Sequence, residues 1–174
     1  YLYSEEELVY VGDAGIVEPN GASRRYGLDV GLRYQLANWL YVDTDVTLVK
    51  ARSLEGIEGE NFIPLAPEFT LSGGAAFTFS RFSGGVRYRF LDDRAANEDN
   101  SIVAEGYFVT DLNLNYKIKN ITVGVRIENL FDINKWAWFM AASARLQNEL
   151  NPVEEIHFTP GTPFFAKASL SYRF

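Results

Sequence analysis

The chain has 174 residues, of which 47% are hydrophobic and 15% aromatic, and its mean hydropathy is −0.11. This length suits one domain. No stretch approaches the roughly 18 consecutive apolar residues of a transmembrane helix, which excludes a helical membrane protein. The net charge of −7 argues against nucleic acid as a partner. Cysteine is absent, so the sequence excludes a disulfide framework and a thiolate metal site.

The pattern that covers most of the chain is a two-residue alternation of apolar and polar side chains. It predicts seven strands and a weaker one near Glu7, because a strand with lipid on one face and water on the other requires this period. Most of these strands exceed the five or six residues or so that are usual in soluble domains. They suit the roughly 9 to 11 residues of a tilted membrane-spanning strand. The expected strands cover residues 7–11, 25–36, 40–48, 69–80, 82–90, 108–118, 121–128 and 163–174.

The links between these strands alternate in length, which is typical of a transmembrane barrel with short turns on one rim and long loops on the other. Short turns are expected at residues 37–38, 80–81 and 119–120, and long links at 12–23, 52–66, 92–103 and 132–162. The last turn is short and therefore periplasmic, so the final strand descends and ends at Phe174 in the periplasm. Aromatic residues near the strand ends are expected to form girdles at the membrane boundary, rather than the core of a soluble sandwich.

Two motifs near the carboxy terminus resemble a known family. The seventh strand ends in Asn129-Leu130-Phe131-Asp132, and the last strand follows a Pro160-Gly161-Thr162-Pro163 turn and ends in Tyr172-Arg173-Phe174. This order is similar to the carboxy-terminal end of TonB-dependent outer-membrane receptors. Phe164 stands where that family often has an arginine.

The resemblance implies an all-β fold: an antiparallel transmembrane β-barrel, with eight strands present out of about 22. Residues 1–174 are then the carboxy-terminal part of the barrel, and the plug domain is absent. The implied function is import of ferric siderophores or similar scarce nutrients across the outer membrane of a Gram-negative bacterium. The alternative is a complete small eight-stranded outer-membrane barrel with a structural or passive-pore role.

The same resemblance implies the partners. These are the lipid bilayer and lipopolysaccharide, a plug domain and through it TonB, the barrel-insertion machinery, and a small-molecule ligand such as a metal chelate. Tyr172 and Phe174 are similar to the terminal aromatic signal read by that machinery.

No catalytic constellation can be assembled from the sequence, so no enzymatic activity, cofactor or metal site of its own is expected. The candidate ligand contacts lie in the last outer loop, where Trp136, Trp138 and Phe139 follow the seventh strand and His157 is the sole histidine. These aromatic residues can either prolong the barrel above the membrane or form a platform for the ring system of a ligand. The histidine can touch a metal chelate or remain an ordinary loop residue.

Charged residues of both signs share the expected inward face, which favours ion-pair ladders between strands. These charges either stabilise the wall of the barrel or bind a plug domain reversibly, and both interpretations stay open. The paired glycines at 73–74 and 84–85 are expected to ease curvature or leave lumenal space. The outer loops are acidic, so calcium binding stays open beside simple solvation. The inward charges are Arg25, Asp29, Arg33, Asp43, Asp45, Arg87, Arg89, Asp111, Lys117, Arg126, Glu128, Lys167 and Arg173.

Overall fold

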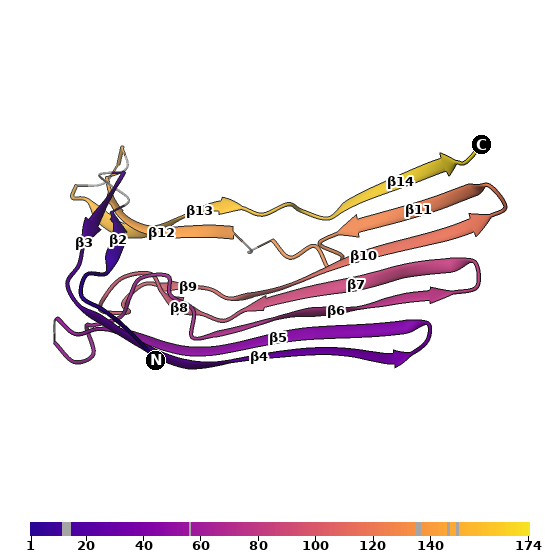
Figure 1. Ribbon diagram of the computed structural model, residues 1–174. Coiled ribbons are helices and arrows are strands. Elements are labelled where there is room, and N and C mark those ends of the chain that lie inside the picture. Colours follow the sequence, from indigo (N-terminus) through magenta and orange to yellow (C-terminus); the bar gives the residue numbers. More distant parts are fainter. Residues whose placement is uncertain (12–14, 56, 135–136, 146, 149) are drawn as a thin grey trace.

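The computed structural model describes residues 1–11, 15–55, 57–134, 137–145, 147–148 and 150–174. Its main element is an antiparallel eight-stranded sheet, called the wall below, with the order β1-β4-β5-β6-β7-β10-β11-β14 (Figure 1). Its members are β1 (Leu2–Ser4), β4 (Ser23–Ala37), β5 (Leu40–Ser53), β6 (Phe69–Phe79), β7 (Phe82–Leu91), β10 (Tyr107–Ile118), β11 (Ile121–Glu128) and β14 (Phe165–Tyr172). Among the described residues, no helix is long and apolar enough to cross a membrane.

The strand register places the apolar and polar positions on opposite faces of the whole sheet, as the alternation predicts. Paired residues share a face, so a row of pairs can be followed from β4 to β14. One such row is entirely apolar except for a tyrosine, and the adjacent row carries charges from β4 to β10. The apolar row is Tyr34, Val42, Ala75, Val86, Leu112, Ile127 and Ala166, and the charged row is Arg33, Asp43, Gly74, Arg87 and Asp111.

Large residues of the apolar face are exposed. Leu28 is 59% exposed and Leu170 is 74% exposed, although both are aliphatic. A continuous apolar face of this extent on a wall of long strands is the face that contacts lipid.

Short turns and long connections lie at opposite ends of the strands (Figure 1). The pairs β4–β5, β6–β7 and β10–β11 are each joined by two residues, at 38–39, 80–81 and 119–120. In the described residues, the long connections carry three two-stranded sheets that are separate from the eight-stranded sheet. These hairpins are β2 (Leu8–Val11) with β3 (Ile16–Pro19), β8 (Arg94–Ala95) with β9 (Val103–Ala104), and β12 (Ala137–Ala144) with β13 (Val153–Pro160).

The expected first wall strand at residues 7–11 is wrong. Leu8–Val11 forms β2 of a separate hairpin, and the strand that pairs with β4 is the shorter β1. The chain leaves the wall after Ser4, and the carboxylate of Glu7 then accepts hydrogen bonds from Ser23 Oγ and from the Arg25 guanidinium. The backbone of Glu7 pairs with Gly21 and Asn20, which starts the hairpin ladder. Three residues are too few for an alternation to reveal β1 in the sequence.

The sheet is open. In the part of the chain that the structure describes, β1 and β14 form its two edges and do not pair with each other. A complete eight-stranded barrel requires that closure, so the arrangement is consistent with part of a larger barrel and does not favour the small-barrel alternative.

Aromatic rings gather at the rim with the short turns. Phe82 and Tyr116 lie with their ring centroids 4.5 Å apart, and Trp39 meets Phe79 edge-on at 5.8 Å. These contacts form the girdle expected at a membrane–water boundary.

Candidate functional site: the lumenal wall and the outer loops

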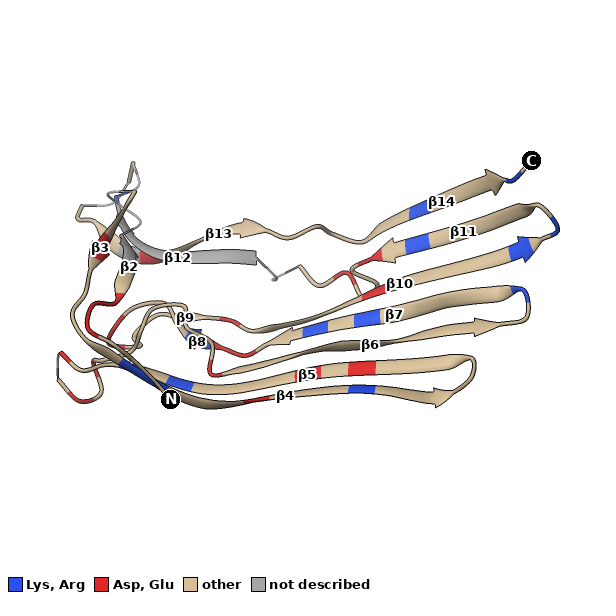
Figure 2. Cartoon of the chain, in the orientation of Figure 1, with Lys and Arg blue, Asp and Glu red and all other residues tan. Residues whose placement is uncertain are grey.

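The polar face of the sheet carries a belt of ion pairs. Figure 2 shows acidic bands on β5, a basic band on the neighbouring β4, and basic bands on β7, which lies beyond β6. Arg33 on β4 donates two hydrogen bonds to Asp45 on β5, at 2.9 and 2.8 Å. Arg89 on β7 lies 3.8 Å from Asp111 on β10. The expected ladder between neighbouring strands is therefore confirmed.

The belt also contains a pair that spans a whole strand. Arg87 on β7 donates from Nη1 to both carboxylate oxygens of Asp43 on β5, at 2.7 and 2.6 Å. In the register, Gly74 of β6 lies between these two residues. A Cβ added to Gly74 would overlap the Val86 carbonyl oxygen and lie 2.9 Å from Arg87 Cδ, so the crossing depends on the missing side chain of this glycine. The expected lumenal space at the paired glycines is used by this side chain.

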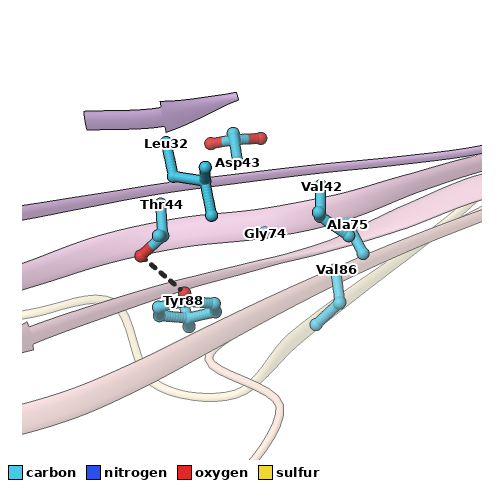
Figure 3. A pocket seen from close by; sticks show the side chains of 8 residues that line it. All are labelled: Leu32, Val42, Asp43, Thr44, Gly74, Ala75, Val86 and Tyr88. Atoms are coloured by element: carbon cyan, nitrogen blue, oxygen red, sulfur yellow. Dashed lines mark hydrogen bonds between the residues drawn. The ribbon is translucent and has the colours of Figure 1, made fainter. Parts of the chain in front are cut away.

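A similar crossing occurs on the apolar face, over Gly73. The Tyr88 hydroxyl donates to Thr44 Oγ1 at 3.0 Å (Figure 3). The Thr44 hydroxyl donates to the Ser72 carbonyl at 3.3 Å. Each hydroxyl therefore has a partner away from water.

A hollow of about 310 Å³ lies beside these hydroxyls on the membrane face. Because most of its lining side chains are apolar and the two hydroxyls are satisfied, it suits contact with lipid rather than a polar ligand. Its lining residues are Leu32, Val42, Asp43, Thr44, Gly74, Ala75, Val86 and Tyr88 (Figure 3).

Acidic residues of the outer loops bind another loop or the end of a wall strand. Glu98 accepts a hydrogen bond from Asn20 at 2.8 Å, and Glu68 pairs with Arg52 at 2.7 Å. The backbone N–H and hydroxyl of Ser101 both donate to Asp99, and these bonds lower the pKa of that carboxyl. No group of acidic side chains and histidine that could hold a metal ion occurs among the described residues.

Three of the four predicted ligand contacts lie on the strands of one hairpin. Trp136 lies outside the described residues. Trp138 and Phe139 belong to β12, and His157 belongs to its partner β13. The register pairs Phe139 with Phe158 and sets His157 one position further along, so three of the four predicted contacts occupy one short stretch of the hairpin.

The base of this hairpin's loop is a site that sequence reasoning missed. Asn129 is 1% exposed and hydrogen-bonds the backbone at both ends of the loop, at Ile133 and at Thr162. Asp132 accepts a hydrogen bond from the backbone N–H of Phe164 at 2.9 Å. The two motifs that carry the family resemblance are thus bonded to each other. Both motifs can be recognised in the sequence, but the hydrogen bonds between them cannot be predicted from it.

The terminal aromatic residues lie at the short-turn rim. The Tyr172 and Phe174 rings are 5.8 Å apart, and both side chains are exposed.

Comparison with known proteins decides the family. The model of the family "TonB dependent receptor-like, beta-barrel" matches residues 6–130, which is more than half of the chain. The chain belongs to the TonB-dependent receptor β-barrel family. It is accordingly a protein of the outer membrane of Gram-negative bacteria, and the family consists of receptors and transporters. None of the curated proteins matches the sequence.

Solved structures of TonB-dependent receptors share the fold. The ferric-catecholate import receptor Fiu from E. coli K12 has a TM-score of 0.65 at 20% identity over 98% of this chain. The siderophore receptor PiuA from Acinetobacter baumannii has a TM-score of 0.67 at 14% identity over 98% of this chain. The ferric yersiniabactin uptake receptor FyuA from Yersinia pestis has a TM-score of 0.64 at 13% identity over 91%. This TonB-dependent receptor chain covers 24% of the length of Fiu, 24% of PiuA and 25% of FyuA.

Proposed function

We propose that residues 1–174 form the carboxy-terminal part of the barrel of an importer for ferric siderophores or similar scarce nutrients. The observation that carries this proposal is the open sheet, which has lipid-facing apolar residues on one side and a belt of ion pairs on the other. An open sheet with a charged inner face suits a barrel that is wide enough to enclose a plug domain. The barrel then acts with a plug domain and, through it, with TonB. Its role is transport and not catalysis.

The ligand is proposed to be a metal chelate bound by the outer loops. Among the structural relatives, Fiu is a ferric-catecholate import receptor, FecA a ferric citrate transporter and OprC a copper transporter. In this chain the contacts are assigned to Trp136, Trp138, Phe139 and His157. Aromatic rings offer flat apolar surfaces to a planar chelator, and an imidazole adds a polar contact.

The remaining contacts follow from the position of the wall in the membrane. The apolar face contacts the lipid bilayer and, in the outer leaflet, lipopolysaccharide. Tyr172 and Phe174 are proposed as the signal read by the barrel-insertion machinery. Both are exposed at the rim with the short turns, which the proposed orientation places in the periplasm.

Uptake of radioactive iron tests the transport function. Cells in which the complete gene is deleted are expected to lose energy-dependent uptake of a ferric catecholate complex under iron starvation, and the intact gene should restore it. Trp138→Ala and His157→Ala should weaken binding of the complex without lowering the amount of receptor at the surface. A library of ferric chelates and copper complexes that shows no deletion-dependent uptake would reject the proposal.

A further inference from the structure

We propose that Asn129 and Asp132 are positioning residues for the last outer loop, residues 133–162. They tie both ends of the loop to the rim of the wall and thereby hold the hairpin that presents the ligand contacts. This inference rests on the proposed function only for its consequence in ligand binding. The tie itself stands on hydrogen bonds within the chain.

The first half of the tie is the side-chain amide of Asn129. Its Nδ2 donates to the carbonyl of Ile133 at 3.0 Å and to the carbonyl of Thr162 at 3.1 Å, 33 positions later in the sequence. Its Oδ1 accepts from the Ile133 N–H at 2.8 Å. One buried amide therefore uses its donors and acceptor to join the start of the loop to its end. Buried hydrogen bonds of this kind are costly to lose, because the groups left behind have no water to replace the partner.

The second half is Asp132, which is three residues further along. Its Oδ1 accepts from the Phe164 N–H at 2.9 Å, where β14 begins. The Asp132 N–H donates to the carbonyl of Asn129 at 3.0 Å, so the two residues form one turn. Both adopt a left-handed backbone with φ of 50°, a conformation that asparagine, aspartate and glycine tolerate best. The Asn-Leu-Phe-Asp motif is thus explained by backbone geometry as well as by hydrogen bonding.

A third contact fixes the tie to the wall. The Asn129 N–H donates to Oδ1 of Asp111 on β10 at 2.9 Å, and the other oxygen of this carboxylate lies 3.8 Å from Arg89. The Leu130 N–H donates to the Thr110 carbonyl at 2.7 Å. The loop base is therefore held by the same aspartate that joins the ion-pair belt.

Hydrogen–deuterium exchange of the intact receptor in detergent tests the tie without any ligand. Asn129→Gly keeps the left-handed backbone and removes the side-chain bonds, so the Ile133 amide should exchange roughly tenfold faster, together with the loop peptides near Thr162. Peptides from the wall strands should exchange as before. Asn100→Gly is the matched control, because Asn100 has a φ of 55° in another outer loop and lies outside the tie. Unchanged exchange in Asn129→Gly overturns the proposal.

A second variant keeps the test decisive if Asn129→Gly does not assemble. Asn129→Asp retains the acceptor for the Ile133 N–H and loses both Nδ2 donations. Exchange should then rise near Thr162 and stay low at Ile133. An equal rise at both ends, or at neither, would contradict the assignment of these bonds.

Ligand binding provides a separate readout. If the wild-type receptor binds an iron(III) catecholate complex, Asn129→Gly should weaken that binding about tenfold at unchanged surface amounts, and Asn100→Gly should not. Faster exchange with unaltered affinity would overturn the positioning role. A wild-type receptor that binds no ferric chelate would reject the proposed function, while the exchange result would still support or overturn the tie.

Discussion

Arg87 and Asp43 form an ion pair across an intervening strand, 44 positions apart in the sequence, with Gly74 beneath the bridging side chain. On the opposite face, Tyr88 reaches over Gly73 to Thr44. Two consecutive glycines in β6 therefore let two consecutive residues of β7 contact β5 on both sides of the wall. The three strands are joined by side chains as well as by their backbone ladders.

Replacing Gly74 with alanine should destabilise the barrel. The new Cβ would press on the Val86 carbonyl and on Arg87 Cδ, forcing Arg87 away from Asp43. Arg87 is 55% exposed, so the ion pair contributes at most about 1 kcal/mol. Backbone strain brings the expected loss to about 2 kcal/mol in urea unfolding of the receptor in vesicles. In the control Gly31→Ala, the Cβ would meet only the ends of the Asp45 and Arg33 side chains, so the loss should stay below about 0.5 kcal/mol.

The hydroxyl pair on the lipid face should be strongly non-additive. Thr44→Val leaves the Tyr88 hydroxyl without an acceptor on an apolar face, at a cost of about 1–3 kcal/mol. Tyr88→Phe removes the donor, while Thr44 keeps its bond to the Ser72 carbonyl, so about 0.5 kcal/mol should be lost. The double variant should resemble Tyr88→Phe alone. A double-mutant cycle measures this coupling, and additive losses would show that the two hydroxyls do not interact.

An arginine on the apolar face should be costly. Leu114 is paired with Val125 and Gly84 near the middle of β10, on the lipid side. Leu114→Arg should lower the free energy of unfolding in lipid by about 2–4 kcal/mol. Asn115→Arg places the same charge one residue away on the lumenal face and should cost far less. Equal losses for the two variants would contradict the assignment of faces, and a greater loss for Asn115→Arg would reverse it.

Phe174 is expected to act in assembly rather than in stability. Phe174→Ser should reduce insertion of the complete receptor in cells, which is measured as surface amount by antibody labelling. Phe79→Ser is the control, because Phe79 is an exposed aromatic residue of the same rim but lies within a strand. An equal decrease in surface amount for both variants would show that Phe174 is an ordinary girdle residue and not an assembly signal.

The isolated 174-residue chain should not form a wide pore. β1 and β14 each present one unpaired edge in the described structure, and unpaired backbone groups are costly in lipid. The strands should therefore close into a narrow barrel or pair with a second copy. Liposome-swelling assays on the refolded chain are expected to detect no uptake of sugars. Large, stable channels would contradict this expectation.

The alternation in the sequence was sufficient to predict the wall. It assigned seven of the eight strands, both faces and the rim with the short turns, because a membrane imposes a different solvent on each successive residue. This constraint is local and can be read one strand at a time. It did not extend to β1, which is three residues long and shows too little alternation.

Only the tertiary structure decided which distant groups meet. The sequence predicted charges of both signs in the lumen, but the choice of Asp43 as the partner of Arg87 depends on the register of three strands and on the missing side chain of Gly74. The pairing of Asn129 with Thr162 likewise depends on closing a long loop, which no local pattern encodes. Local solvent exposure determines a periodicity in the sequence, whereas contacts between distant residues depend on the relative placement of strands and are visible only after folding.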